Sequence, residues 1–460
     1  MVLDPLAAIG ALGCWDHSTE QGYLCRNYCT CHWTRRVRPG RRRVMFLAYH
    51  ERQRRDPHLS EIVSESGSEG RHWRAFDEAA EQPGGDKFSY HFTIRSLQMN
   101  IIKRGTARLA GALPAVALCL LLLFMASCAS THVTARIPGE KAVSSLEYIE
   151  LGGARQLTLI RGEDVSKPIL LFIHGGPGVP FIPFEWMLRG LEKDFIVVFY
   201  DQRGAGRSFP KQVEEDATIR QYVDDAEQLI DILLARFGKE KLYVLGHSWG
   251  SILGLTVASE IPDKLYAYIG MGQMVDGLRN EADAHDFSVR RATERGDAKA
   301  LAALAKLVPP YLDKDGNQVE SQLKEARLWL DRMGGVYWDS KKWSNGKLIP
   351  LLLKSSEYNL FDLLDAEKRG RGAARVVWKE QMAVNFVKTV PKLDVPIYLF
   401  MGKTDYNTSV DLAREYYEKV EAPKGKKFIT FERSGHSPFL EEYDAFASAL
   451  LEVKAETYAE

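Results

Sequence analysis

The chain has 460 residues, 45% of them hydrophobic and 10% aromatic, a composition that excludes a wholly disordered or fibrous protein. Its 61 basic and 61 acidic residues cancel, which excludes a surface built throughout for nucleic acid or anionic membrane. The length fits two or three domains, or one large α/β domain with an insertion. These averages conceal segments of different composition.

The first segment, residues 1–98, contains 13 Arg and 1 Lys, whereas residues 99–460 contain 21 Arg and 26 Lys. Nine of the arginines lie between Arg35 and Arg55, and the segment has no sustained helical or strand period. We predict an Arg-rich extension that is disordered, or one that is not translated because synthesis begins at Met99. A solvated charged tail is favoured over a surface for nucleic acid or lipid headgroups, so no nucleic-acid partner is expected.

Four of the six cysteines lie in this segment, three of them in the cluster Cys25-x3-Cys29-x-Cys31-His32. The cluster has the composition of half a zinc site. Structural zinc needs four ligands, and no second pair at the usual spacing follows. We therefore predict no metal site.

Residues 99–128 have the layout of a secretory signal, with Lys103, Arg104 and Arg108 before an uncharged stretch from 109 to 131. The residues Met-Ala-Ser-Cys at 125–128 resemble the lipobox of bacterial lipoproteins, which implies lipidation of Cys128. An uncleaved membrane anchor is the alternative, since the stretch is long enough to span a bilayer. Either interpretation predicts an exported, membrane-attached protein of the periplasm or cell envelope. No cysteine follows Cys128, so the remaining 332 residues contain no disulfide and no thiol nucleophile.

From about residue 144, strand-like runs alternate with helical stretches, which predicts an α/β fold with a mainly parallel sheet flanked by helices. A hairpin around Gly152-Gly153 opens it, and Ile219–Phe237 is predicted to be helical. The predicted strands are Leu146–Glu150, Gln156–Arg161, Pro168–Ile173, Phe195–Tyr200, Leu242–Leu245, Tyr266–Met271, Ile397–Met401 and Phe428–Phe431. Active sites of such sheets form where the strands end.

Gly246-x-Ser248-x-Gly250 follows one of these strands directly and begins a helix rich in Gly and Leu. A sharp strand–turn–helix connection of this kind lifts a serine clear of the sheet, and the glycines let the backbones pass closely. The motif therefore indicates a nucleophilic serine, Ser248. A plain glycine-rich turn is the alternative.

A serine nucleophile needs a base, and the base needs an orienting acid. Asp405 and His436 follow the strands Ile397–Met401 and Phe428–Phe431, in the chain order Ser, Asp, His that is typical of α/β hydrolases. We predict that His436 is the base and that Asp405 orients it. For each, an ordinary turn residue is the alternative.

An oxyanion hole requires two backbone N–H donors aimed at the developing charge. Trp249, which follows the serine, is expected to supply one, and Gly176 in the His174–Gly178 loop the other. No metal or organic cofactor is needed for this chemistry.

HGGPG at 174–178, DQRGAGRS at 201–208 and GHSWGS at 246–251 together resemble the prolyl iminopeptidase branch of the α/β-hydrolase fold. The resemblance covers about 144–275 and 390–460. It implies a serine hydrolase that releases N-terminal residues, often proline, from short peptides. It also divides the chain into an α/β-hydrolase core, 129–274 with 394–460, and a helical cap insertion, 275–393.

The insertion contains amphipathic runs at Ala298–Leu307 and Gln322–Met333 and several aromatic residues that either form its own core or line a pocket. In the family, cap glutamates hold the free amine of the substrate, one of them in a Trp-x-x-Trp-Glu context that this sequence lacks. Glu281 and Glu380 are the candidates here, with surface charge as the alternative.

The sequence also fits two other functions. The same residues fit an esterase, lactonase or amidase whose substrate has no free amine. A binding lipoprotein that retains the fold without turnover is the alternative from another class. The presence of serine, histidine, aspartate and both oxyanion elements together argues for an enzyme acting on a small molecule or short peptide.

Overall fold

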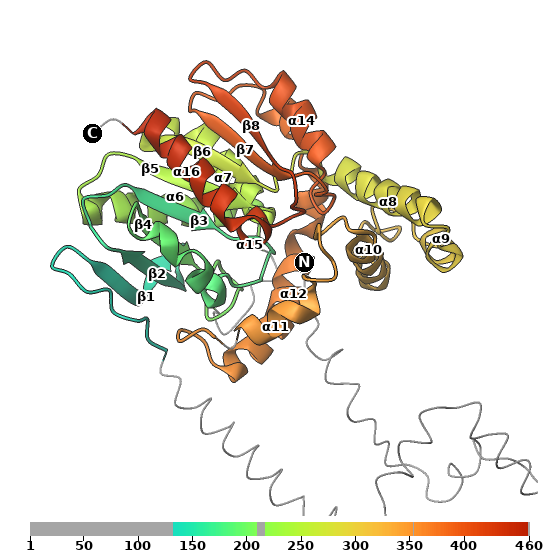
Figure 1. The fold of residues 1–460 in the computed structure, drawn as a ribbon, viewed down its shortest axis with the longest axis horizontal. Coiled ribbons are helices and arrows are strands. Elements are labelled where there is room, and N and C mark those ends of the chain that lie inside the picture. The colour runs from blue at the N-terminus through green and yellow to red at the C-terminus, as the bar shows by residue number, and fades with distance from the viewer. Residues whose placement is uncertain (1–131, 209–216, 353, 459–460) are drawn as a thin grey trace, which may run out of the picture. The chain divides into compact units, whose positions relative to one another are not determined.

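The computed structural model describes residues 132–208, 217–352 and 354–458, all of which belong to one compact unit (Figure 1). The Arg-rich extension, the cysteine cluster at 25–32 and the signal segment with Cys128 lie outside the described residues. Within the described ranges, no helix combines the length and the apolar character needed to cross a bilayer.

Eight strands form one sheet in the spatial order β1-β2-β4-β3-β5-β6-β7-β8, which confirms the predicted α/β fold. β1 and β2 form an antiparallel hairpin, β2 is antiparallel to β4, and all pairings from β4 onward are parallel. The carboxyl ends of the parallel strands therefore lie along one edge. The strands are β1 (Val143–Leu151), β2 (Ala154–Gly162), β3 (Ile169–Ile173), β4 (Ile196–Tyr200), β5 (Leu242–His247), β6 (Leu265–Met271), β7 (Ile397–Gly402) and β8 (Lys426–Phe431).

Helices cover both faces of the sheet because side chains alternate between the faces along each strand. From β3, Leu171 packs in one apolar cluster with α6 (Ile219–Phe237), α7 (Trp249–Glu260) and α14 (Val410–Lys419). Phe172 packs in a second cluster on the other face, with the 3₁₀ helix η2 and with α16. That face includes η2 (Ile182–Met187), η3 (Arg189–Leu191), α15 (Pro438–Glu441) and α16 (Tyr443–Thr457), and the short η4 (Pro262–Lys264) precedes β6.

Local signals explain where α6 begins and ends. Thr218 accepts a hydrogen bond from the backbone N–H of Gln221, whose side chain bonds back to Thr218, and this reciprocal cap starts the helix. Gly238 ends it in the left-handed conformation, with φ of 60°.

Between β6 and β7 the insertion forms helices with an apolar core of their own, which includes Phe287, Trp329 and Leu330. α9 ends three residues before the predicted end, because Lys306 and Leu307 donate instead to the carbonyls of Ala303 and Leu304, three residues back. The helices of the insertion are α8 (Gly277–Glu294), α9 (Ala298–Leu304), α10 (Glu320–Met333), α11 (Asn345–Leu352), α12 (Leu360–Ala383) and α13 (Phe386–Thr389).

Candidate active site

Ser248 occupies the turn between β5 and α7 in a strained backbone conformation, with φ of 57° and ψ of −121°. Glycine is required on both sides of it. A Cβ at Gly250 would lie 2.1 Å from the carbonyl oxygen of Ile173, and one at Gly246 would lie 2.5 Å from that of Gly250. The structure thus places Ser248 on a sharp turn that only this glycine pattern permits.

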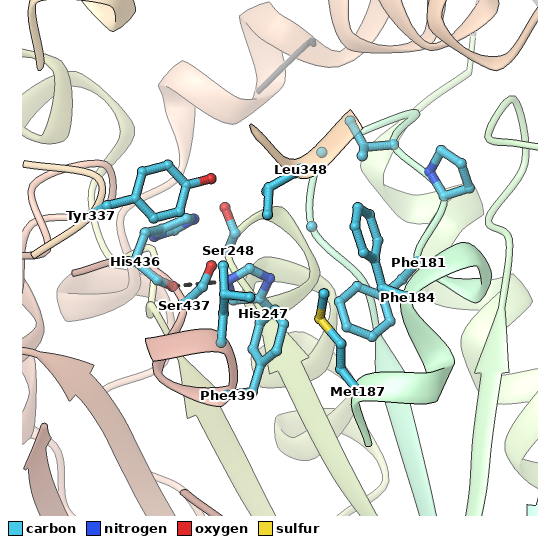
Figure 2. Close-up of a pocket in the computed structure, with 15 residues that line it drawn as sticks. Phe181, Phe184, Met187, His247, Ser248, Tyr337, Leu348, His436, Ser437 and Phe439 are labelled. Atoms are coloured by element: carbon cyan, nitrogen blue, oxygen red, sulfur yellow. Dashed lines mark hydrogen bonds between the residues drawn. The ribbon is translucent and has the colours of Figure 1, made fainter. Parts of the chain in front are cut away.

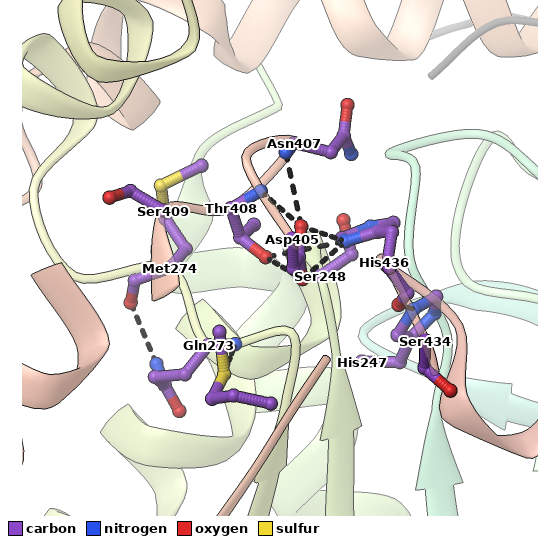
Figure 3. Close-up of polar contacts among 12 residues, drawn as sticks. His247, Ser248, Gln273, Met274, Asp405, Asn407, Thr408, Ser409, Ser434 and His436 are labelled. Atoms are coloured by element: carbon purple, nitrogen blue, oxygen red, sulfur yellow. Dashed lines mark hydrogen bonds and ion pairs between the residues drawn. The ribbon is translucent and has the colours of Figure 1, made fainter. Parts of the chain in front are cut away.

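Asp405 and His436 meet at the same edge of the sheet, from the loops after β7 and β8 (Figure 3). His436 Nδ1 lies 3.0 Å from Asp405 Oδ2 and 3.1 Å from Oδ1, and both side chains are buried. The backbone N–H groups of Asn407 and Thr408 each donate to Oδ1 at 3.0 Å, and the Thr408 hydroxyl donates to Oδ2 at 2.9 Å. These donors hold the carboxylate in a single orientation toward the imidazole.

Gly272, at the end of β6, explains how the His436 ring can lie so close to the sheet. A Cβ at Gly272 would lie 3.0 Å from His436 Cε1 and 3.1 Å from the Thr408 hydroxyl oxygen. With φ of 55°, the position also suits glycine conformationally.

Ser248 and His436 line the same cavity, which has a volume of about 110 Å³ (Figure 2). The core and the insertion both contribute to its walls, which are mostly apolar. The other lining residues are Gly175, Gly176, Val179, Pro180, Phe181, Phe184, Met187, His247, Tyr337, Leu348, Ser437, Phe439 and Leu440.

The His174–Gly178 loop, from which Gly176 was predicted to supply an oxyanion donor, lies against the serine turn. A Cβ at Gly175 would lie 3.0 Å from the Cβ of Ser248, so a larger residue would collide with the nucleophile turn. Gly176, with φ of 132°, lines the cavity beside Ser248. Trp249 is the first residue of α7, where backbone N–H groups have no acceptor within the helix.

Gln202 connects this loop to the serine turn, a role that was not assigned from the sequence. Its backbone N–H donates to His174 Nε2 at 3.0 Å, and its side chain donates to the His174 carbonyl at 2.8 Å. The Gln202 side-chain oxygen accepts from Trp249 Nε1 at 2.9 Å. The only sequence signal for it was its place in the DQRGAGRS motif.

Burial disfavours the charged form of both histidines inside the glycine motifs, His174 and His247. Burial lowers the pKa of His174 to about 4. Burial, and secondarily the nearby His436, lowers the pKa of His247 to about 3. His247 Nε2 donates to the His436 backbone carbonyl at 3.0 Å, so this ring supports the loop that carries His436.

Glu281 and Glu380 are not among the described residues that line the cavity. Glu281 is fully buried and forms a two-bond ion pair with Arg327, at 2.6 and 2.8 Å. Glu380 is exposed on α12 and accepts a hydrogen bond from the backbone N–H of Ile219. Instead, Tyr337 reaches the cavity from the insertion, and no motif distinguishes it in the sequence. Among the described residues, no three His, Cys, Asp or Glu side chains cluster in a way that could hold a metal ion.

Comparison with known proteins relates this chain to hydrolases. Residues 168–443 match the family model described as the alpha/beta hydrolase fold. A Bacillus subtilis (strain 168) protein named Probable aminopeptidase YbaC is 33% identical over 318 residues, which cover 68% of this chain and 97% of that protein. A proline iminopeptidase of Clostridioides difficile (strain 630) is 24% identical over 319 residues, 66% of this chain and 96% of that protein.

Among solved structures, a proline iminopeptidase-related protein of Thermus thermophilus is similar with a TM-score of 0.47 and 19% identity, covering 68% of this chain and 98% of that one. The family match includes strands β3 to β8, the serine turn and the Asp405 and His436 loops. The chain therefore belongs to the α/β-hydrolase family of hydrolytic enzymes.

Proposed function

We propose that Ser248, His436 and Asp405 form a catalytic triad that hydrolyses an acyl bond through a covalent acyl-enzyme. The observation that carries this proposal is the 3.0 Å contact between His436 Nδ1 and Asp405, beside a serine on a strained turn in the same cavity. Asp405 selects the imidazole tautomer that carries hydrogen on Nδ1, which leaves Nε2 as the base.

In the first half-reaction, Ser248 Oγ forms a bond to the substrate carbonyl carbon while its proton moves to His436 Nε2. The resulting oxyanion accepts hydrogen bonds from the backbone N–H groups of Gly176 and Trp249. When the intermediate collapses, the bond to the leaving nitrogen or oxygen breaks and His436 returns the proton to it. Water then attacks the acyl-enzyme with His436 again as base, which releases the acid and restores the Ser248 hydroxyl.

The substrate class we propose first is a short peptide from which the N-terminal residue is released, as the names of the relatives suggest. The cavity's composition supports a second candidate, an ester or amide with an apolar acyl group. Phe181, Phe184 and Phe439 line it, and no carboxylate occurs among the described residues that do so. An ammonium group would find no ionic partner in that set.

A parallel rate assay on the full chain separates these candidates. The substrates are a prolyl anilide, an alanyl anilide, an N-blocked prolyl anilide and a short-chain nitrophenyl ester, with Ser248→Ala as the control. Hydrolysis of the free-amine anilides alone would establish an aminopeptidase, whereas turnover of the ester and the blocked anilide would support the apolar substrate. Activity that survives in the Ser248 variant would refute the triad.

We also propose attachment to a membrane through a lipid on Cys128, which the lipobox-like sequence at 125–128 supports. In a bacterial host, a Cys128→Ser variant should lose incorporation of labelled palmitate and leave the membrane fraction. Unchanged labelling in that variant would contradict the proposal.

A further inference from the structure

A short segment of the insertion, residues 335–339, contacts both loops that carry the proposed acid and base. The Gly335 carbonyl accepts hydrogen bonds from the backbone N–H groups of Tyr406 at 2.9 Å and Asn407 at 3.2 Å. The Val336 carbonyl accepts one from the backbone N–H of His436 at 2.7 Å. The Asp405 and His436 loops are therefore joined through the insertion as well as through their own side chains.

The approach of this segment to the His436 loop depends on a glycine. A Cβ at Gly435 would lie 2.3 Å from the Val336 carbonyl oxygen. Any larger residue would push residues 335–339 away from the loop, because the atom it meets belongs to the backbone and cannot rotate aside.

Glu441, the last residue of α15, accepts hydrogen bonds both from the His436 loop and from residues 335–339. Its Oε2 accepts from the Gly435 N–H at 2.7 Å, while Oε1 accepts from the N–H groups of Trp338 at 2.9 Å and Asp339 at 3.4 Å. An ionised acceptor strengthens each of these bonds relative to a neutral one. The side chain thus links the core loop directly to the insertion.

The neighbouring Glu442 has hydrogen-bond partners in a different place from those of Glu441. It accepts hydrogen bonds from the Arg433 N–H at 2.7 Å and from the Ser434 hydroxyl at 2.9 Å. Both partners belong to the core loop that leads to His436. Glu441 differs in that its side chain also accepts from the backbone N–H groups of residues 338 and 339.

The segment held in this way also forms a wall of the cavity. Tyr337 lies beside His436, and both side chains line the cavity with Ser248 (Figure 2). A shift of residues 335–339 would therefore change the cavity and the support of the His436 backbone together.

We propose that Glu441 is a positioning residue that holds residues 335–339 and the His436 loop in one arrangement, so that the proposed base and the cavity wall are set together. This inference rests on the proposed function of His436 as the base.

The test compares Glu441→Gln with Glu432→Gln in the full chain. Glu432 is the same residue type close by in the chain, but it is exposed and its ion-pair partner is the exposed Lys403. The readouts are the rate constant for labelling Ser248 with a fluorophosphonate, kcat for the nitrophenyl ester, and the melting temperature. In the Glu441 variant, labelling and kcat should fall together by about 10- to 100-fold, because misplacing a catalytic group by about 1 Å costs that much. The Glu432 variant should stay within about twofold of wild type.

The pH dependence provides a readout that a purely structural role would not affect. Burial raises the pKa of Glu441 to about 7 against the opposing effect of its backbone donors, and the nearby Asp405 carboxylate contributes to the rise. Tyr337 also interacts with it electrostatically, and burial raises the pKa of its phenol above the usual value. Above pH 7 wild-type Glu441 is ionised, and below it the protonated form resembles the Gln variant. The ratio of wild-type to variant rates should therefore shrink as pH falls through 7.

Unchanged labelling by Glu441→Gln, with or without a lower melting temperature, would overturn the inference. If Glu441→Gln fails to fold, Gly435→Ala provides the second test, because it displaces the same segment without removing a charge. It should lower the labelling rate in the same way, and normal labelling in a folded Gly435→Ala protein would equally overturn the inference. Loss of labelling in Ser248→Ala together with normal labelling in Glu441→Gln would refute Glu441 alone. Labelling that persists in Ser248→Ala would refute the proposed function itself.

Discussion

The core and the insertion contribute to the same cavity but are encoded in different ways. In the core, Ser248, Asp405 and His436 each follow a parallel strand, in loops that carry glycine or a turn residue. In the insertion, Tyr337 and Leu348 reach the cavity from a segment without a comparable motif. The residues proposed for the chemistry therefore lie in short sequence motifs that can be recognised locally. The shape of the cavity depends instead on how segments distant in the sequence pack together.

Removal of the proposed nucleophile is the strongest test of whether the chemistry lies in the core motifs. Ser248→Ala should lower kcat by about 10⁶-fold, as loss of a serine nucleophile does when no other group can replace it. Steady-state rates with the nitrophenyl ester would measure this, with circular dichroism as the folding control. Substantial turnover by a folded variant would show that the core motifs do not contain the chemistry.

Asp405→Asn should have the next largest effect. The amide can hold the imidazole in the wrong tautomer, which in serine hydrolases lowers kcat about 10⁴-fold while the geometry survives. Thr408→Val is the companion variant, since it removes the hydroxyl that donates to Asp405 Oδ2 and leaves the carboxylate in place. Its loss of kcat should be much smaller. Equal losses would show that the hydroxyl, not the carboxylate, governs the His436 orientation.

On the insertion side, Glu281→Gln should affect stability more than chemistry. It removes the carboxylate charge that pairs with the mostly buried Arg327, which costs about 3–5 kcal/mol of unfolding free energy. The exposed Glu380→Gln should change it by less than about 0.5 kcal/mol. Denaturant unfolding of both variants would measure the difference. If Glu281→Gln instead raised KM for free-amine anilides while stability held, the insertion would contain an amine site after all.

The smallest effect is expected at the cavity wall. Tyr337→Ala should raise KM for an apolar ester by about tenfold, because it removes an aromatic surface worth about 1.4 kcal/mol in contact with the substrate. The Ser248 labelling rate should change less than KM does. If labelling fell as much as predicted for Glu441→Gln, Tyr337 would affect the reactivity of Ser248 and not only substrate binding.

Much of the core was predictable because its signals are local. All eight strands were anticipated within a few residues. The buried central strands β3, β4 and β5 are short apolar runs bounded by turns, and the Gly152-Gly153 turn indicated the opening hairpin. Ser248, Asp405 and His436 could be selected because strand ends of a parallel sheet share one edge. The surroundings of Glu281 and Glu380 could not be predicted from local patterns. Both are acidic residues of the insertion, yet Glu281 is buried against Arg327 and Glu380 lies in solvent.

The sequence by itself therefore determined the fold class, the order of the elements and the residues proposed for the chemistry. Only the tertiary structure decided that Gln202 joins the His174 loop to Trp249, that Tyr337 lines the cavity, and that Glu441 links the His436 loop to the insertion. The physical reason is the distance along the sequence between the residues that interact. Turn conformations and strand periods arise between residues a few positions apart. The Gln202 contacts join residues 28 and 47 positions apart, and the Glu441 contact with Trp338 spans 103 positions, which no local pattern encodes.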